Sequence, residues 1–365
     1  MMASRSNDGS RPRQSLIARR TFHCGGVLLS AVRCLFIFAA VSFTFSGLSK
    51  PFAVAETAAR HSEPSPKSKN ASREASSNPQ SDALLQRARE FLNTGSFKEA
   101  DQTVREYLDG HSNSAEGHFL LGYILFKEQK AQASLAEYTE GAKYHDPEAF
   151  DLKIVALDYV LLGAYSDADR WLTRSVEANP KDSESWYYLG RTKYNENRFQ
   201  EAIHAFEECL QLDPKNTKAQ ANLGLALEGL GRAGDALAAY RKAIAMQDQC
   251  GPKNAEPFID LGNLLLQQNQ VDEAIENLVK ARDIWPQDSR AHESLGKAYL
   301  RLNKFAEAKE ELERAVALEP DSAAAHYMLG QVYRKTGATE RAKAEFDRAV
   351  ALNKTKSSGM STMGP

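Results

Sequence analysis

Cysteine is scarce in this 365-residue sequence, and its scarcity excludes several kinds of protein. Only four Cys are present, and two of them, Cys24 and Cys34, lie near the N-terminus, which leaves too few for a scaffold held together by disulfides. No two of them form a C-x-x-C pair, the spacing typical of structural zinc sites and of covalent haem attachment. We therefore expect no metal and no cofactor.

The sequence also lacks the motifs that mark common enzyme active sites. It has no P-loop, no dinucleotide-binding glycine pattern and no nucleophile elbow. Acidic pairs such as Glu207-Glu208 and Glu310-Glu311 are adjacent in the chain, and adjacent side chains diverge on a helix, so we interpret these pairs as solvated faces. We predict no catalytic residues and a protein that is not an enzyme.

An excess of positive charge is missing from most of the chain. The sequence has 46 Lys and Arg against 48 Asp and Glu, which gives a net charge of −2. Residues 1–55 hold seven basic side chains and one acid, whereas residues 81–365 hold 35 basic and 44 acidic side chains. An acidic surface repels phosphates, so we exclude nucleic acid as a partner.

The basic N-terminal segment has the pattern of an export signal. Six arginines, from Arg5 to Arg33, precede an uncharged apolar run from Cys34 to Leu48. This run has 15 residues, whereas a membrane-spanning helix needs about 20. A signal peptide needs an apolar stretch of about 7 to 15 residues and a small-x-small cleavage site, which Ala53-Val54-Ala55 supplies. We predict cleavage before Glu56. The alternative is a retained anchor within residues 25–48, with the basic flank in the cytoplasm.

Both interpretations of residues 1–55, a signal peptide or a signal anchor, place the body of the protein, residues 81–365, outside the cytoplasm. We expect an exported protein, in the periplasm or outside the cell, or else a membrane-anchored one whose body faces outward. Residues 56–80 contain six Ser, three Pro and no large apolar side chain, which predicts a disordered linker. The tail, residues 355–365, has a similar composition and is also predicted to be disordered.

The body contains one sequence pattern that recurs with a nearly constant step. Leu-Gly pairs begin at residues 121, 189, 223, 261, 295 and 329, and Val155-Ala156 fills the gap. The step is 34 everywhere except between 223 and 261, where it is 38. Thirteen residues after the first member of a pair comes a small residue such as Ala202, and seventeen after it comes a large one such as Phe206 or Tyr240. The four extra residues lie near 250–253 and predict a lengthened loop.

This pattern resembles the tetratricopeptide repeat over residues 81–354. The units are 81–114, 115–148, 149–182, 183–216, 217–254, 255–288, 289–322 and 323–354. The resemblance implies an all-α fold, a right-handed α-solenoid of about eight helix-turn-helix repeats whose first helices line a concave groove. In the first unit Arg87-Ala88 replaces the Leu-Gly pair, as an atypical end repeat would.

The exposed face of each first helix predicts the residues of this groove. They lie about five and two residues before the Leu of each pair, and two and five or six after it. In units two to four these places hold Phe119, Tyr123, Phe126, Leu157, Tyr187, Arg191 and Tyr194, and in units seven and eight they hold Arg290, Lys297, Arg301, Arg334 and Lys335. The hypothesis is a groove with an aromatic end and a basic end. The alternative is that the aromatic rings pack between repeats.

Two histidines and one cysteine occupy packing places of the repeat. His292 and His326 are equivalent to Trp186, and since two ligands do not make a metal site, we expect them to replace an aromatic packing residue. Cys209 takes the place that Ala243 has in the next unit, so we expect a free thiol in the core.

These observations favour an exported, non-enzymatic scaffold or adaptor that binds a protein or peptide through the concave groove. Two other functions are compatible with the same residues. One is a carbohydrate-binding or cell-wall assembly factor, because aromatic rings also stack on sugars. The other is an accessory subunit of an envelope enzyme complex whose catalytic domain lies on another chain.

Overall fold

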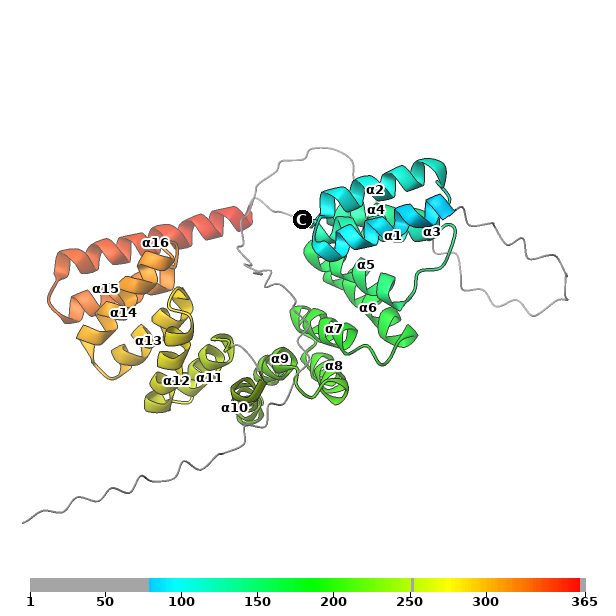
Figure 1. Cartoon of the computed structure of the whole chain (residues 1–365). Helices are drawn as coiled ribbons and strands as arrows, with labels where there is room; N and C mark the ends of the chain where they lie inside the picture. The colour runs from blue at the N-terminus through cyan, green and yellow to red at the C-terminus, as the bar shows by residue number, and fades with distance from the viewer. Residues whose placement is uncertain (1–78, 251–252, 362–365) are drawn as a thin grey trace, which may run out of the picture. The chain divides into compact units, whose positions relative to one another are not determined.

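The computed structural model describes residues 79–250 and 253–361, which form sixteen α-helices and no strand (Figure 1). The first four pairs are α1 (Pro79–Thr94) and α2 (Phe97–Gly110), α3 (Ala115–Lys127) and α4 (Ala131–Gly141), α5 (Ala149–Leu161) and α6 (Tyr165–Ala178), and α7 (Ser183–Asn195) and α8 (Phe199–Leu212). The last four are α9 (Thr217–Gly229) and α10 (Ala233–Cys250), α11 (Glu256–Gln267) and α12 (Val271–Ile284), α13 (Ser289–Arg301) and α14 (Phe305–Leu318), and α15 (Ala323–Lys335) and α16 (Thr339–Ser361). The predicted all-α repeat fold is confirmed.

The predicted leader and nearly all of the predicted linker lie outside the described residues. This includes the apolar run at 25–48 and the predicted cleavage site. Among the residues that are described, no helix is both long enough and apolar enough to cross a membrane.

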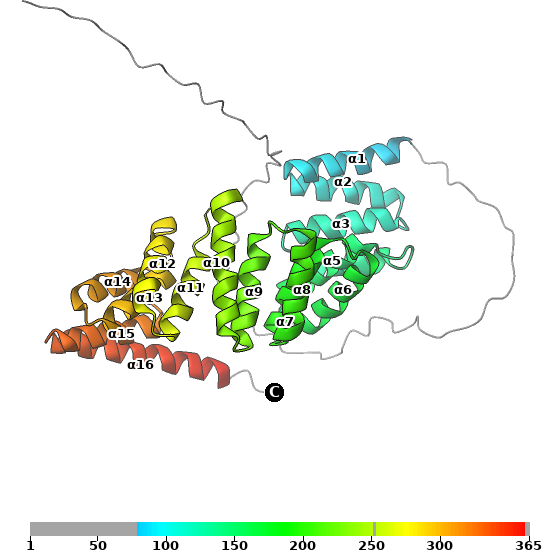
Figure 2. The same ribbon diagram turned by 90° about the horizontal axis from the view of Figure 1, so that it is seen from below.

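The helices form two layers that alternate along the chain. Each helix packs against the helix before it and the helix after it, and Figures 1 and 2 show these neighbours side by side. Contacts that skip one helix join α3 to α5, α5 to α7, α7 to α9, α11 to α13 and α13 to α15. Because these contacts link odd-numbered helices, the odd-numbered helices form one layer, with contacts from α3 to α9 and from α11 to α15, and the even-numbered helices form the other.

The turn inside every pair contains a residue with left-handed backbone. These residues are Gly95, Gln129, Gly163, Asn197, Gly231, Asn269, Asn303 and Gly337, with φ between 56° and 82°. They follow the same step as the Leu-Gly pairs, which is longer only between Gly231 and Asn269. Gly and Asn adopt this conformation at little cost, which explains why seven of these eight turns contain one of them.

The spacing between the Leu-Gly pair and the large residue has a direct packing reason. A Cβ atom on Gly224 would lie 2.5 Å from the Tyr240 ring, and one on Gly190 would lie 2.6 Å from the Phe206 ring. Tyr240 and Phe206 are fully buried. The missing side chain of the first helix therefore makes room for the large ring of the second, and the two helices approach closely.

Replacing Gly224 with alanine is expected to destabilise the protein by about 1 to 3 kcal/mol, because the added methyl group would collide with a buried ring. Urea unfolding followed by circular dichroism would measure the loss. Gly234→Ala is the matched control, because a Cβ atom there meets no atom within 4 Å. Equal stability of the two variants would contradict this account of the glycine.

His292 and His326 are buried and hydrogen-bonded on both ring nitrogens. The Nδ1 of His292 lies 2.6 Å from Glu311 Oε2, and its Nε2 lies 3.1 Å from the carbonyl oxygen of Pro286. His326 makes the same two contacts one repeat later. In the equivalent place, Trp186 Nε1 donates to the carbonyl of Pro180 at 3.0 Å. The histidines therefore take the place of an aromatic packing residue, as expected, and also tie the two helices of their own repeat together.

Cys209 is a core residue, as predicted. Its side chain is fully buried, and burial raises the pKa of its thiol to about 11. Asn216 Nδ2 lies 3.6 Å from its sulfur. A thiol that stays protonated and covered is a poor nucleophile.

The structure shows that the four extra residues mainly lengthen α10, which has 18 residues where α8 has 14 and ends at Cys250, the first residue of the predicted loop near 250–253. No Gly or Pro interrupts the chain between Gly234 and Gly251, so the helix continues to Cys250. The prediction that the insertion lengthens a loop was therefore wrong up to Cys250, whereas Lys253 lies outside any helix and residues 251 and 252 lie outside the described residues.

The structure also corrects the boundaries of the linker and the tail. α16 runs to Ser361, into the segment that was predicted to be a disordered tail, and no Gly or Pro occurs between Gly337 and Gly359 to end it earlier. α1 begins at Pro79, inside the predicted linker, since proline fits the first turn of a helix.

Candidate functional site

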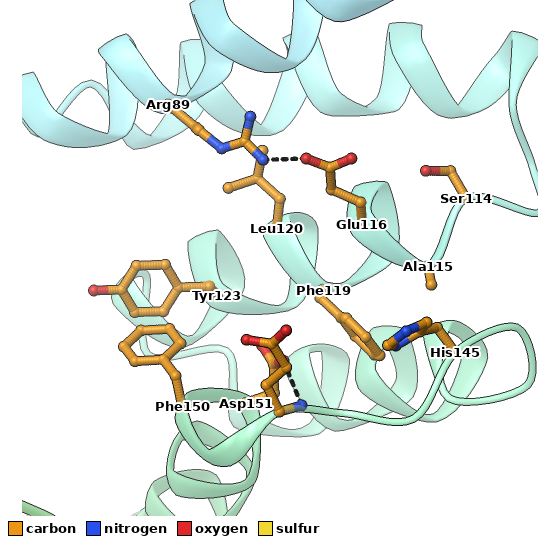
Figure 3. Close-up of a pocket in the computed structure, with 11 residues that line it drawn as sticks. Arg89, Ser114, Ala115, Glu116, Phe119, Leu120, Tyr123, His145, Phe150 and Asp151 are labelled. Atoms are coloured by element: carbon orange, nitrogen blue, oxygen red, sulfur yellow. Dashed lines mark hydrogen bonds and ion pairs between the residues drawn. The ribbon is translucent and has the colours of Figure 1, made fainter. Parts of the chain in front are cut away.

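A cavity of about 610 Å³ opens between α1, α3 and α5 (Figure 3). Its lining residues are Arg89, Ser114, Ala115, Glu116, Phe119, Leu120, Tyr123, His145, Glu148, Phe150 and Asp151. The lining comes from three successive odd-numbered helices and from the segment that precedes α5. We call it the aromatic cavity.

Three aromatic rings form the wall of the aromatic cavity. Tyr123 and Phe150 meet edge to face, with ring centroids 5.1 Å apart, and 46% of Phe150 is exposed. Phe119 lies beside His145 in Figure 3, and its ring stacks on the buried Tyr138 at 5.7 Å. The wall is therefore held from behind by the repeat core and presents apolar ring surface to the cavity.

Charged side chains border the aromatic wall. Arg89 of α1 forms an ion pair with Glu116 of α3 on the opposite side of the cavity from Phe150 (Figure 3). Asp151 accepts a hydrogen bond from the backbone N–H of Glu148 at 3.0 Å, and burial raises the pKa of the Asp151 carboxyl. This arrangement suits an amphipathic ligand, with an apolar part on the rings and polar groups at the border.

Lys153 fixes the α5 edge of the aromatic cavity. Its ammonium group is buried and donates to Asp182 at 3.0 Å and to Glu184 at 2.7 Å, at the N-terminus of α7. The same nitrogen lies 5.4 Å from the centre of the Phe150 ring. A single buried cation thus joins α5 to α7 and supports the ring that projects into the cavity.

A second cavity, of about 690 Å³, lies between α7, α9, α11 and α13. Its lining residues are Tyr194, Leu225, Glu228, Gly229, Ile259, Asp260, Asn263, Gln267, Arg290, Glu293, Ser294 and Lys297. It lies where the fifth repeat, with its longer α10, meets the sixth. We call it the acidic cavity, because carboxylates outnumber cations in its lining.

Five of the twelve predicted groove residues line one of these cavities. Phe119 and Tyr123 line the aromatic cavity, and Tyr194, Arg290 and Lys297 line the acidic cavity. The remaining seven residues line neither cavity. The structure therefore brings the predicted surface together only in part.

The predicted aromatic residues outside the cavities pack against neighbours. Phe126 stacks on Tyr123 at 6.3 Å, and Leu157 packs against the core around Tyr138. Tyr187 lies 6.2 Å from the Phe206 ring and accepts a hydrogen bond from Asn222 Nδ2 at 3.4 Å. For Tyr187 the alternative that the ring packs between repeats describes its position.

The predicted basic residues outside the cavities are also partly engaged. Arg191 lies over the Tyr187 ring at 5.9 Å, and Arg334 lies over the Phe346 ring at 5.6 Å. Arg301 donates to the backbone carbonyl of Leu266. Lys335 is exposed on the last turn of α15.

Phe150, Glu228, Glu293 and Asp260 are cavity residues that the sequence analysis missed. Phe150 lies five residues before Val155, so the rule used for the other groove residues would have found it. Glu228 and Glu293 also satisfy that rule, at five after Leu223 and two before Leu295. Asp260 immediately precedes Leu261, a place outside the rule, and no sequence signal indicates that it enters a cavity.

Family models described as "Tetratricopeptide repeat" match most of the described chain. One model matches residues 85–149, 189–255 and 294–356. A second matches 229–298 and 265–316, and a third matches 171–204.

Curated relatives share only part of their length with this chain. It is 33% identical over 104 residues to the "Peroxisomal targeting signal receptor" of Saccharomyces cerevisiae, and the aligned residues are 28% of this chain and 16% of that protein. It is 26% identical over 196 residues to "Essential for maintenance of the cell wall protein 1" of the same organism, and the aligned residues are 53% of this chain and 21% of that protein. The chain thus spans about a fifth of the length of these relatives.

A solved structure shares the fold over nearly its whole length. A tetratricopeptide repeat protein from Parabacteroides merdae superposes with a TM-score of 0.55 and 16% identity, covering 70% of this chain and 99% of that one. The likeness at this level of identity concerns the fold alone.

Proposed function

Because the chain belongs to the tetratricopeptide repeat family, we propose that it is a scaffold that binds a partner protein and performs no chemistry of its own. The observation that carries the proposal is the aromatic cavity, where Tyr123 and Phe150 present ring surface between three first helices. Aromatic anchors in a preformed cavity bury a large apolar area at a low cost in side-chain entropy. An extended segment of a partner that carries apolar and polar groups fits both the rings and the charged border.

Export is part of the proposal. The basic N-terminal segment followed by the apolar run at 34–48 supports a signal peptide, or an anchor within 25–48. In either case the repeats would meet their partner outside the cytoplasm. The acidic body, with 35 basic and 44 acidic residues from 81 onward, is consistent with a protein or peptide partner rather than a nucleic acid.

The experiment selects peptides from a library of random dodecapeptides on the full chain and measures their dissociation constants by fluorescence anisotropy. The variant Tyr123→Ala with Phe150→Ala removes the two rings that meet edge to face. We expect binding to weaken about 30-fold, which corresponds to about 2 kcal/mol for the loss of an anchor.

The matched control is Tyr327→Ala, since Tyr327 is also an aromatic residue on an odd-numbered helix and is 52% exposed, but lies outside both cavities. All variants must melt at the same temperature as the parent. Unchanged affinity in the double variant would overturn the proposal. An oligosaccharide array probed in parallel tests the alternative of a carbohydrate ligand, and selective sugar binding without peptide binding would favour it.

A further inference from the structure

We propose that the acidic cavity binds one basic side chain, lysine or arginine, of the partner segment. The proposal rests on the proposed function, because it assigns a chemical class to one residue of that partner. It is argued from the position of the carboxylates, from the pairing of the cations and from the cavity itself.

Three carboxylates line the acidic cavity without an ion pair to any described residue. Glu228 accepts hydrogen bonds from Tyr240 Oη at 3.0 Å and from Gln267 Nε2 at 3.1 Å, both neutral donors. Glu293 accepts one from Ser322 Oγ at 2.8 Å. Asp260 accepts none from the described part of the chain. No described cation therefore forms an ion pair with these three groups.

The cations of the same cavity do not cancel this charge. Arg290 is held by Asp288 through two contacts, Nε to Oδ1 at 3.0 Å and Nη2 to Oδ2 at 2.8 Å. Glu256 lies 3.6 Å from Arg290 as well, so this arginine is already surrounded by acids. Lys297 is exposed and is the one cation of the lining without an ion pair among the described residues. The balance of the lining is negative.

The environment of Asp260 supports the same assignment. Burial, together with the nearby Glu256, Glu228 and Asp288, raises the pKa of its carboxyl to about 7, while Arg290 opposes this rise. A carboxyl in such surroundings gains from a cation that enters the cavity, because the cation stabilises its ionised form. Tyr194 and Leu225 supply ring and aliphatic surface along which the methylene groups of a lysine or arginine side chain can lie.

The test uses four pools of fluorescein-labelled nonapeptides, random at eight positions, with the central residue fixed as Arg, Lys, citrulline or Glu. Citrulline has the shape of arginine without its charge. We expect the full chain to bind the Arg and Lys pools at least tenfold more tightly than the citrulline pool, and the Glu pool most weakly. In Asp260→Asn this preference should fall about tenfold.

The control is Asp272→Asn, an exposed acid on α12 outside the acidic cavity, in which the preference should stay unchanged. Glu293→Gln is a second cavity variant, which should also reduce the preference, and it keeps the test valid if Asp260→Asn fails to fold. Equal binding of the four pools, or an unchanged preference in both cavity variants, overturns the acidic-cavity proposal. In that case the double variant Tyr123→Ala with Phe150→Ala decides about the proposed function. If this variant binds the peptide pools more weakly than the parent does, the proposed function stands. If no pool binds, both proposals are overturned.

Discussion

Replacing Phe206 with alanine is expected to lower the free energy of unfolding by about 3 to 5 kcal/mol. The side chain is fully buried in α8, where its ring lies against Gly190 of α7 and 6.2 Å from the Tyr187 ring. Gly190 has no side chain that could fill the space left by the ring, so a cavity would remain. Urea unfolding followed by circular dichroism would measure the loss.

Leu212→Ala is the matched control for Phe206→Ala, because Leu212 ends the same helix and is 40% exposed. A change of less than about 1 kcal/mol is expected there. Because each repeat packs only on its neighbours, the Phe206 variant should unfold first around the fourth and fifth repeats. Similar stabilities of the two variants would show that the ring does not hold the helix pair together.

Replacing Asp158 with asparagine is expected to make the protein more stable at pH 8 than the parent. Asp158 is fully buried on α5, its carboxylate oxygens accept no hydrogen bond from the described residues, and the neighbouring Ser134 donates to the carbonyl of Gly122 instead. Burial raises the pKa of this carboxyl to about 7. At pH 8 the folded protein therefore contains an uncompensated buried charge.

The sign of the pH dependence follows from the two states of Asp158. The folded protein keeps the proton up to about pH 7, whereas the unfolded chain releases it near pH 4. Between these values the folded state binds more protons, so the contribution of Asp158 to stability falls as the pH rises and is lost above about pH 7. The stability difference between Asp158→Asn and the parent should grow by an amount on the order of 4 kcal/mol from pH 4 to pH 8.

Urea unfolding at several pH values would measure this difference. The difference, rather than the absolute stability, is the informative quantity, because other carboxyls titrate in the same range in both proteins. The lowered pKa of Asp182, for example, acts in the opposite direction. Asp347→Asn, at an exposed position of α16, is the control and should show no such trend. A flat difference for Asp158→Asn would mean that water or a neighbour compensates the charge.

The fold was predictable because its signal is local and repeated. The number of residues between the Leu-Gly pair and the large residue follows from helix geometry. The contact of Gly224 with the Tyr240 ring shows why both the glycine and the large residue are needed. The four-residue insertion was less predictable. A longer loop and a longer α10 shift the next repeat by the same number of residues, so the repeat spacing alone does not distinguish them.

The site was predictable only in part, because equivalent positions have different neighbours. Phe119 and Tyr187 occupy the same place in their repeats, yet Phe119 borders a cavity while Tyr187 is covered by packing and bonded to Asn222 of the next repeat. Arg290 likewise was expected to face a ligand, but it is held by Asp288, two residues before it. Such choices depend on side-chain contacts between repeats, which periodicity does not encode.

The constant step of the helix pairs has a consequence for the evolution of the gene. The second helix of each pair packs against the first helix of the next pair, and each internal turn contains a residue in the same backbone conformation. A duplication or deletion of one whole unit therefore joins surfaces of a kind that already exist, and the chain can change length without a new type of contact. Since the aromatic cavity is built by the first three units and the acidic cavity by the fourth to the seventh, such rearrangements can remove or copy one recognition element and leave the other intact.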